Sequence, residues 1–450
     1  MTPRRSTTLA AIAAGAATLV VLAGCSASGA ASSSGSASSG PVTIDFWHAM
    51  SGPAATELDA LVAQFNAQNT DGVTVKASFQ GAYADIQTKY TAAVQSGSTP
   101  DLLMMNDVST GFMVDSGQTV PASTFTKADK GFDLADIAPA AKNYYSGADG
   151  LEAMPFSVST PVLYLNKQLV AQAGLDVSKP PTTLADVATW AEKIHQTTGA
   201  YGMSMNMADS WMLEELSAAG GKAFCTPDNG RKGKEVTGVS LTSSTQVAFM
   251  KTLQGLYRDG SALNPGTDSA AQNSAFASDK VGLLLTSSGS YTTVDPDRTK
   301  SVVATFPTTS SSKDAGEVIG GNALWISGKG HSTAEQRAAY EFAAFLTTAD
   351  AQAAWAKATG YLAINTGAAD TTVGTATLAD PNVATMYRQL AADPASTATA
   401  GCITGAFPTV RATVIGAFNK VVEGADVAST MRDAEQQAKS QIASYNEAKG

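Results

Sequence analysis

Histidine and cysteine are scarce in this sequence: a chain of 450 residues contains only three of each. The histidines are His48, His195 and His331, which lie far apart in the chain. None of them has the close spacing of a metal-binding pair on one helix. The sequence therefore argues against a histidine-rich metal site, and we expect neither a metal ion nor a cofactor.

Basic residues are also few. Charged residues make up 15% of the chain, and the formal net charge is −10. A nucleic-acid-binding surface needs clustered Lys and Arg to neutralise phosphates, and no such cluster occurs in the sequence. The composition thus excludes a nucleic acid as the expected partner.

Catalytic motifs are missing as well. The serines in the segment SSGSY, residues 287–291, do not form the GxSxG turn of a serine hydrolase. Acidic residues are scattered, and no two of them suggest the facing carboxylates of a glycosidase. The metal-binding acids and histidines expected of a phosphodiesterase are not apparent either. We therefore predict that the chain is not an enzyme, with a phosphodiester or glycoside hydrolase as the less favoured alternative.

The amino terminus carries a targeting signal. Two arginines are followed by an apolar run over residues 9–22, which is too short to span a bilayer comfortably and fits a signal peptide over residues 1–24. The run ends in LAGC, which resembles a bacterial lipobox with Cys25 as the lipid-bearing first residue of the mature protein. Residues 25–40 then form a tether of Ser, Gly and Ala. These features predict a protein anchored by lipid to the outer face of the cytoplasmic membrane; the alternative is an ordinary signal peptide with an incidental cysteine.

The two other cysteines form an even pair if Cys25 carries a lipid. Outside the cytoplasm, Cys225 and Cys402 are then expected to form a disulfide. Two buried free thiols remain the alternative.

Hydrophobic periodicity alternates between strand and helix patterns along the chain. Strands are predicted over residues 42–47, 73–79 and 101–105, and helices over residues 54–67, 83–94, 184–195, 245–257, 334–346, 349–358 and 425–448. Thr183 is a plausible N-cap for the helix that reaches His195. Strands separated by helices indicate an α/β protein with a parallel sheet covered on both faces.

Three extended segments differ from ordinary connections. They cover residues 154–166, 319–325 and 359–365, and they are rich in small hydroxyl residues or glycine. Three such crossings are enough to tie two α/β lobes together around a cleft.

Several short motifs occur in an order that resembles the extracellular solute-binding proteins of ABC importers. They are FWHAMSG at Phe46, STPVLYLN at Ser159, SSGS at Ser287, IGGNALW at Ile319, TGYL at Thr359 and PTVRATV at Pro408. More narrowly, they resemble the members of this family that bind glycerol 3-phosphate and glycerophosphodiesters. The resemblance covers nearly the whole mature chain.

The resemblance implies a two-lobed, type 2 periplasmic-binding-protein fold with a hinge and a central ligand cleft. We expect the first lobe to comprise residues 41–155 and 318–363, and the second residues 156–317 and 364–450. The function implied is capture of glycerol 3-phosphate or a glycerophosphodiester, such as glycerophosphocholine, by a monomer that delivers it to a membrane permease. A binding protein for an uncharged sugar or oligosaccharide is the alternative, and a structural lipoprotein without a cleft is a third class.

The same resemblance implies a polar ligand site. Its residues are Tyr83, Asp107, Ser159, Ser288, Gly321, Tyr361 and Arg411, with Trp47, His48, Trp211, Ser287 and Gly320 as further candidates. The chemistry is suitable, because arginine offers a planar donor pair for phosphate, serine donates to oxyanions without adding charge, and glycine admits a ligand close to the backbone. A carboxylate repels phosphate, so Asp107 is expected to accept hydrogen bonds from glycerol hydroxyls.

Two positions depart from the family pattern. Asp107 occupies a position where relatives carry Glu, and Ala219 one where some relatives carry Trp. Both changes alter the space around a ligand. They leave open whether the monoester or a diester is preferred, and whether Trp211 compensates for Ala219.

Overall fold

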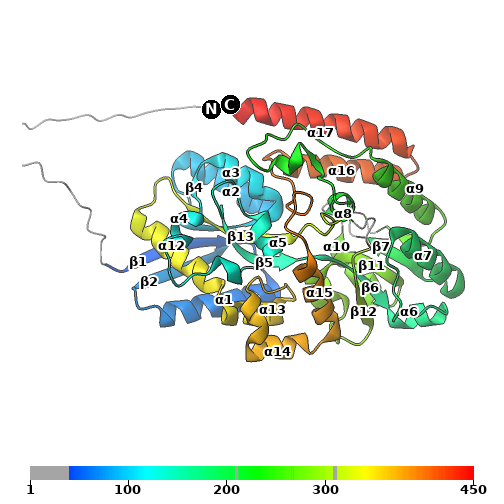
Figure 1. Ribbon diagram of the computed structural model, residues 1–450, viewed down its shortest axis with the longest axis horizontal. Coiled ribbons are helices and arrows are strands. Elements are labelled where there is room, and N and C mark those ends of the chain that lie inside the picture. The colour runs from blue at the N-terminus through cyan, green and yellow to red at the C-terminus, as the bar shows by residue number, and fades with distance from the viewer. Residues whose placement is uncertain are drawn as a thin grey trace, which may run out of the picture. The chain divides into compact units, whose positions relative to one another are not determined.

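The computed structural model describes residues 40–205, 207, 211–264, 266, 268–307 and 312–449. These residues form two large β-sheets with helices around them, and the two sheets lie in separate parts of the fold (Figure 1). Cys25 and the predicted signal peptide lie outside the described residues. Within the described part of the chain, no helix combines the length and apolar character needed to cross a bilayer.

The first sheet has six strands. Its main path runs β2-β1-β3-β13-β4, and β5 also pairs with β13. The strands are β1 (Val42–His48), β2 (Val73–Phe79), β3 (Leu102–Asn106), β4 (Thr119–Val120), β5 (Met154–Ser159) and β13 (Gly320–Ser327). β1 pairs in parallel with β2 and β3, whereas β13 is antiparallel to its three neighbours.

Helices cover this sheet on both sides, as expected for strands with buried residues on each face. Figure 1 shows α1 and α2 on opposite sides of the strands β1 and β2. We call the part of the molecule built around this sheet the first half, and the part built around the second sheet the second half. The helices of the first half are α1 (Gly52–Gln68), α2 (Tyr83–Ser96), α3 (Thr110–Ser116), α4 (Ser123–Thr126), α5 (Pro139–Tyr144), α12 (Thr333–Leu346), α13 (Ala349–Thr359) and α14 (Thr372–Leu378).

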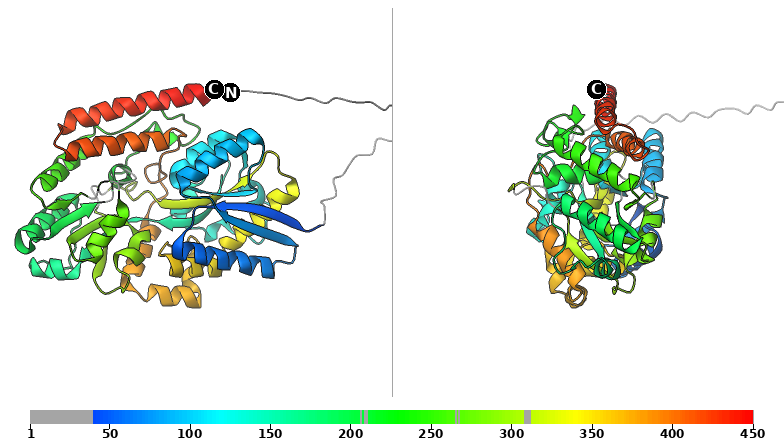
Figure 2. Two further views of the ribbon diagram at one scale, coloured as in Figure 1. Left: turned by 180° about the vertical axis from the view of Figure 1, so that it is seen from behind. Right: turned by 90° about the vertical axis from the view of Figure 1, so that its right-hand side faces the viewer.

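The second sheet has five strands in the order β10-β7-β11-β6-β12. They are β6 (Pro161–Asn166), β7 (Tyr201–Met205), β10 (Ala262–Leu263), β11 (Val281–Ser287) and β12 (Ser301–Thr305). The helices of this half are α6 (Lys167–Gln172), α7 (Leu184–Thr198), α8 (Trp211–Ala219), α9 (Ser244–Arg258), α10 (Ser269–Ala277), α11 (Tyr291–Val294), α15 (Pro381–Ala392), α16 (Phe407–Val422) and α17 (Val427–Lys449). Figures 1 and 2 show α16 and α17 running side by side.

The predicted elements agree closely with these bounds where the periodicity is long. The side chain of Thr183 accepts a hydrogen bond from the backbone of Asp186 and caps α7 as predicted. One hydrophobic core surrounds the first sheet and extends onto one face of the second, and another core covers the opposite face of the second sheet and continues into α16 and α17.

The lobe boundaries differ from the expected ones at two places. The expected boundary after Pro155 falls inside β5, which pairs with β13 along its length and so belongs to the first half. Residues 359–365 also stay in the first half, because Leu362 bridges to Val158 and Asn365 to Ile137. The chain passes to the second half only at α15, which packs on β12.

The passage from β5 to β6 is abrupt, because Thr160 alone separates them. The backbone amide of Thr160 donates to Ser288 Oγ at 3.1 Å, and Gln389 Nε2 donates to Thr160 Oγ1 at 2.7 Å. This crossing is therefore held by side chains of the second half.

A two-stranded hairpin, β8 (Cys225–Thr226) with β9 (Gly238–Val239), lies beside the segment that precedes α16. Cys225 and Cys402 are joined in a disulfide across 177 residues of sequence. Asn229 reinforces the connection, since its side chain accepts from the Cys225 amide at 2.7 Å and donates to Thr397 O at 2.8 Å.

Candidate ligand-binding site

The predicted site residues come from both halves and from the ends of elements. Tyr83 begins α2, Asp107 begins a 3-10 turn after β3, and Ser159 ends β5. Gly320 and Gly321 begin β13, and Tyr361 follows α13. Ser288 and Arg411 come from the second half, on the turn after β11 and on α16.

Tyr83, Asp107 and Gly321 are linked in the first half. Asn322 Nδ2 donates to the Tyr83 hydroxyl at 2.9 Å, and the Gly321 amide donates to Asp107 Oδ1 at 3.3 Å. Gly321 has φ 135°, and a Cβ there would lie 1.9 Å from Ser157 O, so only glycine fits. Burial raises the pKa of Tyr83 well above its ordinary value, and the neighbouring Tyr361 raises it further, so the hydroxyl remains a hydrogen-bond donor.

Ser159 lies between two glycines and two aromatic rings. A Cβ added at Gly320 would be 3.0 Å from Ser159 Oγ and 3.5 Å from the Trp211 ring. A Cβ added at Gly289 would be 3.7 Å from Ser159 Cβ and 3.6 Å from the Tyr361 ring. Substituting either glycine would therefore narrow the space around Ser159.

Arg411 is buried and ion-paired. Its Nε and Nη2 lie 2.8 and 2.7 Å from Glu214 Oε1, and Nη2 lies 3.7 Å from Asp107 Oδ2. The guanidinium carbon is 5.0 Å from the centre of the Phe407 ring. Glu214 is only 1% exposed, so this pair is shielded from water. The formal charges of Arg411, Glu214 and Asp107 sum to −1. Arg411 is the cation among them and is the group that can bind an anion.

Sequence reasoning did not find Glu214. The available signal was its position in the otherwise apolar helix WMLEELSAA, where two adjacent acids on a buried helix call for partners. Both Glu214 and Glu215 are buried in the structure.

The serines at the end of β11 and directly after it have structural partners. Ser287 Oγ accepts from the Gly289 amide at 3.1 Å, while Ser288 Oγ accepts from the Thr160 amide. Tyr164 donates its hydroxyl to the Ser287 and Ser288 carbonyls at 3.1 and 3.2 Å. The hydroxyl groups that follow this buried strand thus fix the turn and its link to the crossing between the sheets.

The further candidates are placed differently from one another. Trp211 and Gly320 lie beside Ser159. His48 ends β1, where its Nδ1 accepts from the Met50 amide at 3.3 Å and its ring packs near Phe46 and Phe79. No contact described for His48 or for its neighbour Trp47 joins either residue to the seven principal candidates.

Trp211 and Ala219 are well separated on α8. The two positions lie at opposite ends of α8, about 12 Å apart along the helix axis. Ala219 instead borders a cavity of about 430 Å³ that is also lined by Glu317 and Asp393.

Three acidic residues lie close together beside this cavity: Glu317, Asp393 and Glu215. The Glu317 amide donates to Asp393 Oδ1 at 2.8 Å, and the next amide, of Val318, donates to Glu215 Oε2 at 3.0 Å. Burial raises the pKa of Glu317 to about 10 and, with Asp393 beside it, favours a carboxyl group that keeps its proton. Burial raises the pKa of Asp393 and of Glu215 as well.

We expect the free energy of unfolding to fall as the pH rises from about 5 to 9. The folded chain retains a proton on Glu317 that the unfolded chain releases above the ordinary pKa of 4.5. This contribution is complete below pH 4.5 and is lost as the pH rises towards the folded value of about 10. Urea denaturation at several pH values measures the slope. Glu317→Gln should flatten it and the exposed Asp314→Asn should not; equal slopes for wild type and Glu317→Gln would contradict the assignment.

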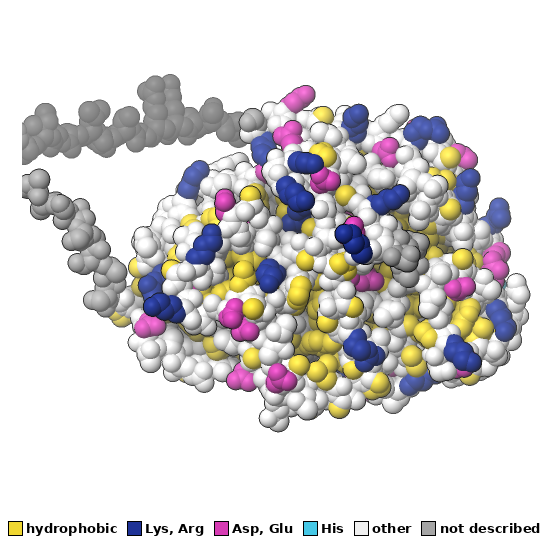
Figure 3. All heavy atoms as spheres, viewed as in Figure 1, with side chains coloured by type: hydrophobic (Ala, Val, Ile, Leu, Met, Phe, Trp, Pro, Cys, Tyr) yellow, Lys and Arg dark blue, Asp and Glu magenta, His cyan; other side chains and the backbone are white. Residues whose placement is uncertain are grey.

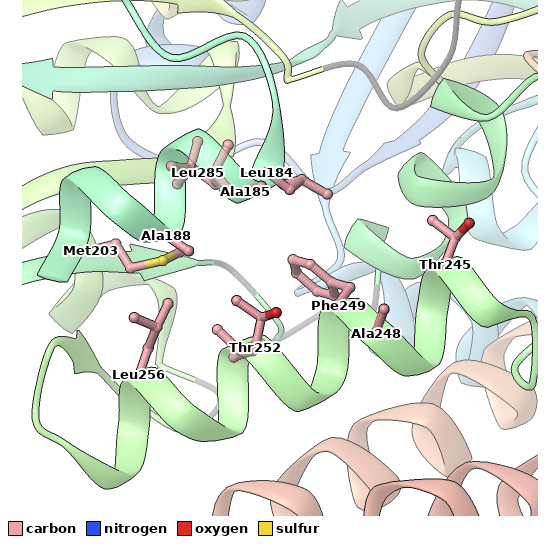
Figure 4. A pocket seen from close by; sticks show the side chains of 12 residues that line it. Leu184, Ala185, Ala188, Met203, Thr245, Ala248, Phe249, Thr252, Leu256 and Leu285 are labelled. Atoms are coloured by element: carbon pink, nitrogen blue, oxygen red, sulfur yellow. The ribbon is translucent and has the colours of Figure 1, made fainter.

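A separate apolar cavity of about 210 Å³ lies between α7 and α9 (Figure 4). Its lining includes Leu184, Met203, Phe249 and Leu285, and none of the candidate site residues borders it. The cavity supplies almost no polar group to orient a polyol or a phosphate, so it is not the candidate site.

Among the described residues, one group has the composition of a possible metal site: Asp101, His331 and Glu335. The two ring nitrogens of His331 lie 2.7 Å from Asp101 Oδ1 and 2.8 Å from Thr99 Oγ1. Glu335 Oε2 accepts from the Ser332 amide in a capping box at the start of α12. These hydrogen bonds account for the cluster as a structural connection between two loops.

Comparison with known proteins agrees with this architecture. The model of the bacterial extracellular solute-binding protein family matches residues 60–385. The sn-glycerol-3-phosphate-binding periplasmic protein UgpB of Escherichia coli K12 is 30% identical over 383 residues, covering 83% of this chain and 86% of UgpB.

Two solved structures share the fold. UgpB from Mycobacterium tuberculosis in complex with glycerophosphocholine superposes with a TM-score of 0.75 at 22% identity, covering 90% of this chain and 99% of that chain. The cyclic alpha-maltosyl-1,6-maltose binding protein from Arthrobacter globiformis gives 0.73, also at 22% identity, with the same coverage. The predicted two-lobed periplasmic-binding-protein fold is confirmed by these neighbours.

Proteins of this family bind solutes outside the cytoplasm and are not enzymes, in agreement with the sequence-based prediction. The match covers well over half of the chain, and the identity to UgpB extends over most of both proteins. The chain therefore belongs to the bacterial extracellular solute-binding proteins, the substrate-binding components of ABC importers.

Proposed function

We infer that this protein captures glycerol 3-phosphate or a glycerophosphodiester between its two halves and delivers it to an ABC permease. The observation that carries the inference is the position of Arg411, a buried cation from the second half that reaches Asp107 of the first. A phosphate is the group that arginine binds best, and the nearby Asp107 carboxylate and Tyr83 hydroxyl are suited to the hydroxyl groups of a polyol. The identity to UgpB over most of the chain supports the same ligand class.

A second ligand class also has an observation in its favour. Arg411 is already paired with Glu214, and two carboxylates stand near it. The net negative charge of this site does not repel an uncharged polyol. In addition, a structural neighbour binds a cyclic oligosaccharide. An uncharged sugar is therefore the alternative ligand.

Calorimetric titration with glycerol 3-phosphate, glycerophosphocholine and maltose separates the two classes. We expect saturable binding of at least one of the two phosphates and no heat from maltose. Binding of glycerophosphocholine without release of choline would match a receptor. Binding of maltose alone would overturn the phosphate assignment and leave the family unchanged.

We also propose that Cys25 bears the lipid that holds the protein at the membrane. The support is the LAGC sequence followed by the Ser/Gly tether. A lipid mass on the N-terminal peptide of the membrane fraction tests this, and a mature N-terminal peptide without lipid would contradict it.

A further inference from the structure

Arg231 is a buried cation that has no acidic partner among the residues that the structure describes. It follows the short turn Asp228–Gly230, and the residue is 8% exposed. Its Nη1 donates to the carbonyls of Tyr144 at 2.8 Å and Ser146 at 3.3 Å, and Nε donates to Gly401 O at 3.2 Å. Among the described residues, Nη2 has no hydrogen-bond partner and no carboxylate forms an ion pair with this guanidinium.

This arrangement leaves positive charge uncompensated. A buried charge is unfavourable unless an opposite charge balances it, and the carbonyl groups supply only partial negative charge. The Tyr144 ring, with its centre 5.4 Å from the guanidinium carbon, adds a further weak attraction. Burial lowers the pKa of Arg231 to about 10, which still leaves it charged at neutral pH.

Arg231 also lines a cavity of about 590 Å³ between the two halves. Ser146 and Glu152 border it from the first half, and Lys232 and Thr397 from the second. The cations Arg231 and Lys232 outnumber the one carboxylate, Glu152, whose pKa is raised by burial and by Asp149. The cavity thus combines net positive charge with hydroxyl groups, the donor set that binds oxyanions.

We propose that this cavity is a second ligand site, which takes a small tetrahedral oxyanion such as phosphate through Arg231. The site is distinct from the one around Arg411 and does not depend on the proposed function. Because its walls come from both halves, an anion held there favours the arrangement in which they meet. Bound anion should therefore stabilise the protein, by an amount that grows with the logarithm of the anion concentration divided by its Kd.

Titration with inorganic phosphate tests the proposal. The paired variant Arg411→Met with Glu214→Gln removes the cation of the principal site and leaves the Asp107 carboxylate there, so phosphate bound by this variant has to bind elsewhere. We expect the paired variant to bind phosphate saturably, and addition of Arg231→Gln to weaken that binding about 30-fold or more, as for loss of a charge-assisted contact. Absence of phosphate binding in the paired variant, or equal binding with and without Arg231→Gln, would overturn the proposal.

Two further variants, both made in the paired variant, keep the test decisive if Arg231→Gln fails to fold. Ser146→Asp leaves Arg231 in place but adds a carboxylate to the cavity wall, so it should abolish the remaining phosphate binding and raise the unfolding midpoint. Lys234→Gln is the matched control, because Lys234 lies in the same loop, half exposed and paired with Asp228. Lys234→Gln should bind phosphate as tightly as the paired variant in which it is made. Unchanged phosphate binding after Ser146→Asp would reject the site.

Discussion

Replacing Arg411 by alanine is expected to weaken the binding of glycerol 3-phosphate or a glycerophosphodiester by about one and a half to three and a half orders of magnitude. This range corresponds to the roughly 2–5 kcal/mol lost when one member of a buried, hydrogen-bonded charge pair is truncated. Titration calorimetry of the wild type and Arg411→Ala measures the difference.

The ion pair with Glu214 adds a second expected effect. Arg411→Ala removes the cation that pairs with the buried Glu214 carboxylate. Breaking such a buried pair lowers the free energy of unfolding by about 3–5 kcal/mol. Weaker binding by Arg411→Ala could therefore result from the lost contact with the phosphate, from the lower stability of the protein, or from both.

The paired variant Arg411→Met with Glu214→Gln separates these contributions. The paired replacement also removes the unpaired Glu214 carboxylate that Arg411→Ala leaves behind, so we expect most of the stability to return while the phosphate remains weakly bound. Glu214→Gln alone is the matched control, because it keeps Arg411 and removes the competing carboxylate. If the paired variant binds the phosphate as tightly as the wild type, Arg411 is a structural residue and the phosphate assignment fails.

Removing the disulfide with Cys225→Ala and Cys402→Ala is expected to lower the free energy of unfolding by about 5 kcal/mol. The bond closes a loop of 177 residues of sequence, and the entropy that a cross-link removes from the unfolded chain grows with loop length. Urea denaturation of the wild type and the double variant measures the effect.

Reduced wild-type protein is the natural control for the disulfide, because it loses the bond without losing either sulfur. It should unfold at a urea concentration close to that of the double variant. Alkylation of both thiols in the native, unreduced protein, or coincident unfolding curves for oxidised and reduced wild type, would contradict this expectation.

The sequence was sufficient for elements with long hydrophobic periodicity. α9 and α12 occupy almost the predicted residues, because each presents one apolar face at helical spacing to a core. The boundary between the halves was harder to place. A strand such as β5, buried along its length, carries no local sign of which sheet it joins, so Ser159 was expected in the second half and is found in the first.

The candidate site was predictable only in part, for a related reason. Motif order supplied residues such as Asp107 and Arg411, but pairing between distant segments determines what each one contacts. The bond between Arg411 and Glu214 joins α16 to α8, which are 197 residues apart in sequence. Periodicity cannot reveal such a contact, although two acids within an apolar helix indicate that partners exist.

The crossing at Thr160 links the position of the two sheets to the chemistry of the site. Since one residue separates β5 from β6, any rotation of the sheets at this crossing changes the backbone torsion angles of Ser159 and Thr160. A change in this backbone also moves the Cα–Cβ bond that carries the Ser159 hydroxyl. The peptide group between Ser159 and Thr160 donates to Ser288 Oγ at 3.1 Å, so the same backbone is also bonded to the second half. Ser159, a residue proposed to hold the ligand, thus lies in the stretch of backbone that joins the two sheets.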